Sequence, residues 1–237
     1  NFLAYGLGIN PAAKFIHLSA SSDLALENSE GAQDIIKTNA YKQIFPKVQI
    51  KKNSDSKKKW YTTAGGGVYA TSAGGQVTGF GAGITESDEQ VEAEDDEMSD
   101  EELDAILSDI EEKEGFGGAI VIDDPIKPDD TNSDVKRERV NSRWGSTIKS
   151  RVNSRNTPVI LIMQRLHPRD MAGYLQEIEG VIGEGGEWEV ISLPAMYVDE
   201  SGALQCLDPT KHTVEDLLAM EKNEDEEIRI AFQHQYQ

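Results

Sequence analysis

Cysteine is almost absent from this chain of 237 residues, and the single Cys206 excludes an internal disulfide. This usage agrees with a reducing compartment. Nothing in the sequence supplies a base beside Cys206, so we interpret it as a buried or incidental thiol. No apolar run approaches the roughly 20 residues that a membrane-spanning helix requires, and no signal peptide is evident. We therefore expect a soluble, intracellular protein.

Motifs for metal and phosphate binding are also missing. The four histidines show neither the H-E-x-x-H pattern nor paired Cys/His spacing, so a zinc site is not expected. The sequence contains no G-x-x-x-x-G-K-S/T loop, with which P-loop enzymes hold nucleotide phosphates. Gly79–Gly83 fails the G-x-G-x-x-G spacing and precedes an acidic tract rather than a helix. The chain begins at Asn1 without a methionine, and we interpret it as a fragment or processed piece.

The net charge of −20 is concentrated in one segment. Residues 86–114 contain 16 Asp or Glu and one Lys, a net charge of −15. Almost no apolar residue falls within 85–97, so we expect disorder there, because too little surface can be buried to offset ordering entropy. Ser99 and Glu102 form a capping box, which predicts a short helix whose apolar face follows. We interpret residues 84–116 as an acidic, partly disordered insertion, either a solvated decoration or a docking or DNA-mimicking arm.

The remainder alternates between strand and helix patterns, which predicts an α/β fold with a largely parallel sheet in a three-layer sandwich. Ser22 or Asp23 can cap the first helix, and Asp170 can cap the helix that follows it. In the helix expected over residues 133–154, Gly145 marks a plausible break. Its apolar residues Val135, Val140, Trp144 and Ile148 recur at about four-residue steps, and Arg137 is among the basic residues of its polar faces.

The glycines at 65–67 predict a hairpin between the strands that flank them. The apolar run Pro158–Met163 is typical of a strand buried on both faces, and strand 119–122 is expected to lie between the strands at about 14–20 and 158–163. The expected strands are Lys14–Ala20, Trp60–Thr63, Val68–Ser72, Ala119–Ile122, Pro158–Met163 and Trp188–Leu193, and the expected helices are residues 22–39, 133–154, Asp170–Gly180 and Val214–Tyr236.

Two consecutive carboxylates, Asp123 and Asp124, follow the apolar strand 119–122, and Pro125 then blocks further strand pairing. Open α/β sheets bind ligands just outside the carboxyl ends of their strands. In nucleotide-hydrolysing folds this strand delivers one acid that helps to hold Mg²⁺ and a neighbour that orients water. The pattern alone also fits a polar turn.

Several ordered blocks together resemble the ATPase domain of the large terminase subunit of tailed bacteriophages, the motor that packages DNA into the capsid. The resemblance covers most of the chain apart from the acidic insertion. It implies a P-loop NTPase of the RecA-like type that lacks its N-terminal phosphate loop, with residues 1–83 and 117–237 as two parts of the core and the second part running toward a nuclease-domain linker. The blocks are residues 13–25, 74–83, 119–130, 140–155, 157–168 and 169–173.

The resemblance implies ATP and Mg²⁺ as cofactors and assigns roles to particular residues. Asp123 would hold Mg²⁺ directly or through water, and Asp124 stands where many members have the glutamate that positions the attacking water. Gln164 lies at the coupling motif, where many members have a small hydroxyl residue. Arg165 either stabilises transferred charge or forms an ion pair with Asp123, Asp124 or Asp170. The candidates for an arginine that one subunit donates to the active site of its neighbour are Arg139, Arg143 and Arg151. The alternative is that these arginines belong to a solvated helix face.

Double-stranded DNA, a small terminase subunit and a portal protein are the implied partners, and the implied setting is a ring of identical subunits in the host cytoplasm. Because the phosphate loop is missing, we expect no ATP hydrolysis by this chain alone. A helicase-like P-loop ATPase is the second hypothesis, although no further helicase motif is present. The third is a non-enzymatic acidic interaction module. Deleting residues 85–115 separates these hypotheses, since a motor core would keep its nucleotide site and an interaction module would lose its partner.

Overall fold

The computed structural model describes residues 1–73 except 53 and 55, residues 116–148 and 157–225, and Arg229 and Phe232. The chain divides into two compact units. Unit 1 comprises residues 1–126 and 138–162, and unit 2 comprises residues 127–137 and 163–237. The predicted acidic arm and its helix, the glycine-rich 74–83 and Arg151 lie outside the described residues.

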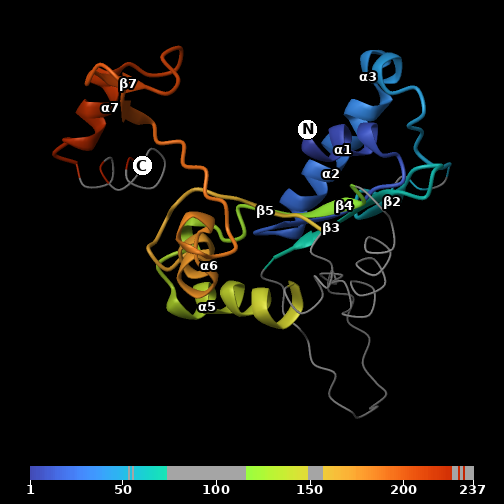
Figure 1. The fold of residues 1–237 in the computed structure, drawn as a ribbon, viewed down its shortest axis with the longest axis horizontal. Helices are drawn as coiled ribbons and strands as arrows, with labels where there is room; N and C mark the ends of the chain where they lie inside the picture. Colours follow the sequence, from blue (N-terminus) through green and yellow to red (C-terminus); the bar gives the residue numbers. More distant parts are fainter. Residues whose placement is uncertain are drawn as a thin grey trace, which may run out of the picture. The chain divides into compact units, whose positions relative to one another are not determined.

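A five-stranded sheet forms the centre of unit 1 (Figure 1). Its order is β2-β3-β1-β4-β5, in which β3, β1, β4 and β5 are parallel and only β2 is antiparallel. This arrangement confirms the predicted α/β class with a largely parallel sheet, and it places β4 between β1 and β5 as expected. The strands are β1 (Lys14–Ser19), β2 (Lys59–Tyr61), β3 (Gly67–Ser72), β4 (Gly118–Asp123) and β5 (Val159–Ile162).

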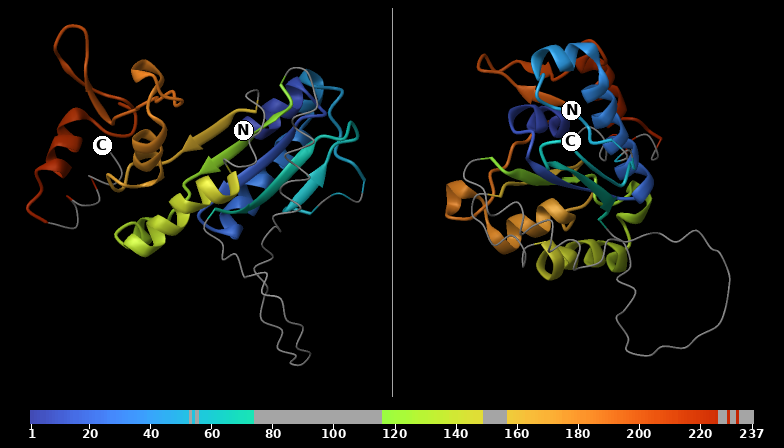
Figure 2. Two further views of the ribbon diagram at one scale, coloured as in Figure 1. Left: turned by 60° about the horizontal axis from the view of Figure 1, so that its bottom comes forward. Right: turned by 90° about the vertical axis from the view of Figure 1, so that its right-hand side faces the viewer.

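Helices α1 (Phe2–Ile9), α2 (Ser22–Lys37) and α3 (Asn39–Ile44) lie on one side of the sheet (Figures 1 and 2). Side chains alternate along each strand, so every second residue of the sheet faces these helices. The main core forms there, from buried residues of α1, α2, α3 and the inward-facing strand positions. Its largest members include Leu7, Phe15, Ile36 and Trp60.

Helix α5 (Asp134–Arg143) continues into the π-helical turn η2 (Trp144–Ile148), and the two run on the other side of the sheet (Figure 2). The change of helix type at Trp144 agrees with the predicted break near Gly145. Val140, Trp144 and Ile148 are buried, as their four-residue spacing predicts. The prediction was wrong at Val135, which is exposed, and at Arg137, which is buried and bonds to Asp134 and the Thr131 carbonyl instead of lying on a polar face.

Several features differ from the sequence-based expectations. The last expected helix is interrupted, since α7 (Val214–Glu221) ends at Glu221 and residues 222–225 are not helical. The cap of α2 is Ser21, whose Oγ accepts from Leu24 N–H, and not Ser22 or Asp23. Strand β5 was expected to be buried on both faces, but it is an edge strand and Ile162 is 52% exposed. Residues Trp188–Leu193 do not form a strand; Trp188 makes an isolated bridge to Val181, and Ile191 and Leu193 are exposed. An apolar run alone does not reveal whether a neighbouring element covers it.

The hairpin between β2 and β3 forms as predicted across the glycine cluster. Gly65 has φ +87°, a left-handed conformation that glycine adopts without steric cost. The edge strand β2 therefore pairs antiparallel with β3 through a tight turn, with Trp60 opposite Val68.

Unit 2 consists of short elements. Asp170 caps α6, as predicted, because its side chain accepts from the Gly173 N–H. Thr213 and Asp216 form a capping box at α7. Among the described residues, no helix combines the length and the apolar content that crossing a bilayer requires. The elements are η1 (Pro128–Asp130), α6 (Met171–Glu179), η4 (Ile182–Glu184), β6 (Met196–Val198), β7 (Leu204–Cys206) and α7 (Val214–Glu221).

Candidate functional site

Asp123 is the last residue of β4, at the carboxyl end of the parallel sheet. The preceding residues of the strand are buried, and β4 is held on both sides, by β1 and by β5. The register places Asp123 beside Ser19 of β1 and Ile162 of β5. The carboxylate therefore belongs to an interior strand, which is the position at which open α/β sheets present ligand-binding groups.

Asn28 joins Asp123 to a buried histidine. The Asn28 Nδ2 atom of α2 lies 3.1 Å from Asp123 Oδ2 and 3.1 Å from His17 Nε2. An amide nitrogen only donates and carries two hydrogens, so it can serve both acceptors. The His17 Nε2 atom then accepts, which places the ring proton on Nδ1. Three elements, β1, α2 and β4, thus converge on one polar chain at the end of the sheet.

His17 is neutral at physiological pH. His17 is only 3% exposed, and burial lowers its pKa to about 4, with a further contribution from the positive amino terminus. A neutral imidazole offers the lone pair that the Asn28 amide needs. Protonation would replace that lone pair with an N–H facing an N–H, so the neutral form keeps the amide turned toward Asp123.

Two buried polar atoms of β1, His17 Nδ1 and Ser19 Oγ, have no hydrogen-bond partner among the residues that the structure describes. Ser19 is fully buried and is the strand neighbour of Asp123. Buried polar atoms are normally satisfied, so these two groups on the same face of β1 are exceptions.

The Asp123 carboxyl has capacity left for a ligand. Its Oδ2 accepts from Asn28, and no contact to its Oδ1 is recorded from the described residues. Burial raises the pKa of Asp123 above its ordinary value, although the Asn28 hydrogen bond acts in the opposite direction. A partly desolvated carboxylate with one open oxygen suits Mg²⁺, which is commonly held by one or two carboxylates together with waters and substrate phosphates. The donor set at this position therefore fits the predicted magnesium role of Asp123.

Asp124 adopts a left-handed conformation with φ +43°, and among the described residues it is the one non-glycine with positive φ. Its N–H donates to the Ile162 carbonyl at 2.8 Å, which extends the pairing of β4 with β5 by one residue. Aspartate tolerates this conformation better than most residues, but the conformation still carries strain. The strained turn exposes the Asp124 residue at the sheet end directly after the metal candidate.

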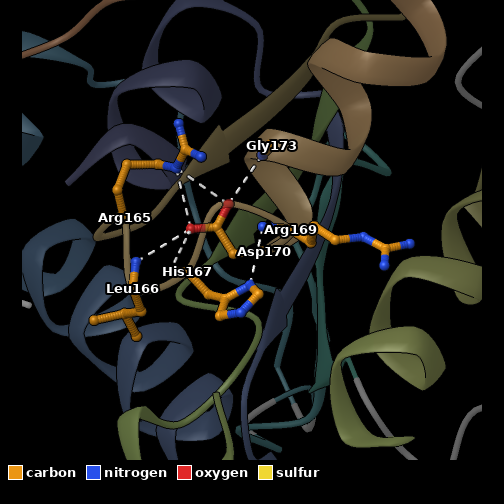
Figure 3. A network of polar contacts seen from close by, with 6 residues as sticks. All are labelled: Arg165, Leu166, His167, Arg169, Asp170 and Gly173. Atoms are coloured by element: carbon orange, nitrogen blue, oxygen red, sulfur yellow. Dashed lines mark hydrogen bonds and ion pairs between the residues drawn. The ribbon is translucent and has the colours of Figure 1, made fainter. Parts of the chain in front are cut away.

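Gln164 and Arg165 follow β5 by two and three residues and belong to unit 2. Gln164 is exposed. Arg165 forms an ion pair with Asp170, with Nε 3.0 Å from Oδ2 (Figure 3). The ion pair with Asp170 is one of the alternatives predicted for Arg165. Asp170 is fully buried and also accepts from the Leu166, His167 and Gly173 N–H groups. His167 Nδ1 accepts from Arg169 N–H, so the predicted turn after the coupling strand is a closed local network.

Gly173 allows the first turn of α6 to close against this network. A Cβ at position 173 would lie 2.0 Å from the Pro168 carbonyl oxygen, which is backbone and cannot move aside. The glycine therefore has a structural reason within the turn that holds Arg165.

The remaining predicted arginines stay predictions. Arg139 is exposed and Arg143 is half-buried on α5, whereas Arg151 is outside the described residues. His17, Ser19 and Asn28 were not predicted as site residues. A signal was present for Asn28, since it lies three residues after Ala25 and one before Ser29 on the face of α2 that packs on the sheet. A polar amide on a buried helix face needs a partner.

Within the described ranges, no group of three or more His, Cys, Asp or Glu residues is placed to hold a metal ion. Comparison with protein-family models and with curated proteins gave no match to this chain.

Proposed function

We propose that this chain is part of the ATP-hydrolysing motor that packages double-stranded DNA into the capsid of a tailed bacteriophage. The observation that supports it most is the position of β4, an interior parallel strand that delivers Asp123 to the carboxyl edge of the sheet. Three of the sequence blocks that resemble large terminase subunits, residues 13–25, 119–130 and 157–168, include β1, nearly all of β4, and β5. In this reading the fold is a P-loop NTPase core.

In this proposal Asp123 would hold Mg²⁺, and the metal would neutralise charge on the nucleotide phosphates. Asn28 would keep the carboxylate oriented by donating to Oδ2, and neutral His17 would keep the Asn28 amide in place. Asp124 would accept a hydrogen bond from the attacking water. Aspartate is one methylene shorter than the glutamate found in many related motors, so its approach to the water differs slightly.

Gln164 is proposed as the coupling residue because it follows β5, and β5 pairs in parallel with β4. In the complete motor protein, Gln164→Ala should leave ATP binding nearly intact and lower ATP turnover and DNA translocation together. Loss of one polar contact disturbs the transition state more than the ground state. Equal loss of binding and turnover would assign Gln164 a structural role, and normal packaging would remove it from the mechanism.

The metal and water roles are tested by ATP hydrolysis in the complete motor protein. Asp123→Asn and Asp124→Asn should each lower turnover by at least about 100-fold, since both act on the transition state. Asp129→Asn, an exposed acid outside the sheet, is the matched control. This chain by itself should show no hydrolysis, because its sequence has no lysine-bearing phosphate loop. If the isolated chain hydrolysed ATP and its Asp124→Asn variant did not, that expectation would be wrong.

A further inference from the structure

Residues 37–59 are strongly basic within an acidic protein. They contain eight lysines and one aspartate, a net charge of +7 in a chain whose net charge is −20. The segment comprises α3, the loop that follows it and the start of β2, which is an edge strand. Figure 1 shows these elements together at one end of unit 1. We refer to residues 37–59 as the lysine edge.

Half of these lysines have a recorded partner of their own. Lys37 pairs with Asp34 at 3.4 Å and Lys57 pairs with Glu30 at 2.7 Å. Lys59 lies over the Tyr69 ring, 5.9 Å from its centroid, and Lys58 also takes part in a contact. The other four are exposed and make no ion pair with any described residue; they are Lys42, Lys47, Lys51 and Lys52.

The backbone that carries the four exposed lysines is well anchored. Val48 is buried in the main core, and the Lys51 N–H donates to the Tyr61 carbonyl at 2.8 Å. Gln49 accepts from the Thr63 N–H at 2.8 Å, and Ile50 bridges to Thr62. The cations therefore project from a fixed surface, and little backbone entropy would be lost when they bind a partner.

The four exposed lysines are distant from the candidate magnesium site, whereas Lys57 pairs with Glu30 in the middle of α2. Helix α2 starts after the carboxyl end of β1 and has 16 residues, which gives it a length of about 24 Å at 1.5 Å per residue. The lysine edge begins where α2 ends. A partner bound there would leave the carboxyl edge of the sheet accessible to nucleotide.

The aromatic residues of the segment do not form a stacking surface. Tyr41 is buried and Phe45 is half-buried. Single-stranded nucleic acid is normally bound by exposed aromatic rings together with basic residues, whereas lysines alone suit the phosphates of a duplex. Such contacts are independent of base sequence.

We propose that the lysine edge binds the phosphate backbone of double-stranded DNA through Lys42, Lys47, Lys51 and Lys52. This inference deepens the proposed packaging function by naming the surface that contacts the cargo. Four phosphate contacts predict that the logarithm of the binding constant falls with the logarithm of salt concentration with a slope of about −3.6. This slope distinguishes phosphate contacts made by lysines from contacts made by neutral groups.

The test is the binding of a fluorescently labelled DNA duplex of mixed sequence to the full chain between about 50 and 200 mM NaCl. A triple variant, Lys47→Gln, Lys51→Gln and Lys52→Gln, should reduce the magnitude of the salt slope by about 2.7 and weaken binding roughly tenfold or more. The matched control, Lys127→Gln, Lys211→Gln and Lys222→Gln, changes the net charge equally at exposed positions elsewhere. It should leave the slope unchanged.

Equal slopes in the two triple variants, or no binding by the wild-type chain at the lowest salt, would overturn the proposal. Polyglutamate of matched charge serves as a competitor, and displacement of DNA by it at equal or lower concentration would indicate an acidic protein partner instead. Because the assay contains no ATP, its failure is separate from a failure of Asp123 and Asp124 in the hydrolysis assay. The three substituted loop lysines make no recorded side-chain contact, and a thermal melt confirms that each variant folds.

Discussion

Two aspartates lie at or beyond the ends of parallel strands in this protein, the fully buried Asp170 and the half-buried Asp123. They differ in the number of hydrogen-bond donors around the carboxylate. Asp170, after β5, accepts from Arg165, Leu166, His167 and Gly173 and is fully buried. Asp123, at the end of β4, has one recorded donor, Asn28. A carboxylate saturated with donors is a structural part of the fold, whereas one left with an open oxygen has capacity for a ligand.

The comparison also separates stability from function. The donors around Asp170 recover the hydration that the acid lost on burial. The environment of Asp123 does not, because burial raises the pKa of this acid despite its Asn28 hydrogen bond. Groups held in an unfavourable ionisation environment are common at functional sites. Substitutions at the two acids should therefore change stability in opposite directions.

The largest effect is expected at Asp170. Asp170→Ala removes the cap of α6 and leaves buried N–H groups without an acceptor, which should cost unit 2 about 3 kcal/mol. Hydrogen exchange of the α6 amides measures this locally, with the exposed Asp129→Ala as control. Unchanged protection in the Asp170→Ala variant would contradict the structural role assigned to this acid.

The next effect is a loss of stability in acid through His17. Its folded pKa of about 4 lies below the ordinary value of 6.5, so the unfolded chain binds the proton first. Stability is therefore full above pH 6.5 and falls as the pH decreases toward 4, by up to about 3 kcal/mol. Urea unfolding across this pH range should show the loss in the wild type and a smaller loss in His17→Gln. Equal pH dependence in both proteins would mean that His17 titrates normally.

Removing the single donor of Asp123 sharpens the comparison further. Asn28→Ala should lower the free energy of unfolding by about 2 kcal/mol, because a hydrogen bond to a half-buried carboxylate is lost. The same substitution should raise the pKa of Asp123 still more, because that hydrogen bond favours the charged form. Unfolding measurements and NMR titration of the Asp123 carboxyl test the two effects. Glu27→Ala, at an exposed position of α2, should change neither quantity.

The smallest effect has the opposite sign. Asp123→Asn should stabilise the chain slightly at neutral pH, by about 1 kcal/mol or less, since the ionised form is disfavoured in the folded state. Asparagine can still accept from the Asn28 amide. The gain should disappear as the pH falls through the raised pKa, because the wild-type acid is then neutral as well. A loss of more than about 1 kcal/mol at neutral pH would show that Asp123 is a structural acid like Asp170.

The strand order around the candidate site could be anticipated from the sequence. The hydrogen-bonded network of His17, Asn28 and Asp123 could not. The apolar run before Asp123 and the strand patterns near residues 14 and 158 correctly indicated three neighbouring parallel strands. The link between His17, Asn28 and Asp123 depends on side chains from three elements, and residues 28 and 123 are far apart in sequence. Spacing in the sequence can indicate that Asn28 needs a polar partner, but it does not identify His17 and Asp123 as those partners.

The errors have a physical cause as well. The apolar residues of β5 and of residues 188–193 have the composition of buried strands, but burial depends on whether another element packs against them. Ile162 and Ile191 are exposed because none of the described elements covers them fully. In contrast, the cap at Asp170 was predicted correctly, since capping is a local interaction within four residues.

The most direct test of the central claim is to locate divalent-cation binding in this chain by NMR. Mn²⁺ can replace Mg²⁺ at oxygen ligands and broadens nearby amide signals. Mn²⁺ should broaden the amides at the ends of β1 and β4, and Asp123→Asn should abolish this while Asp129→Asn leaves it unchanged. Broadening confined to the acidic residues 86–114, or broadening at the strand ends that persists in Asp123→Asn, would contradict the assignment of Asp123 as the metal-binding residue.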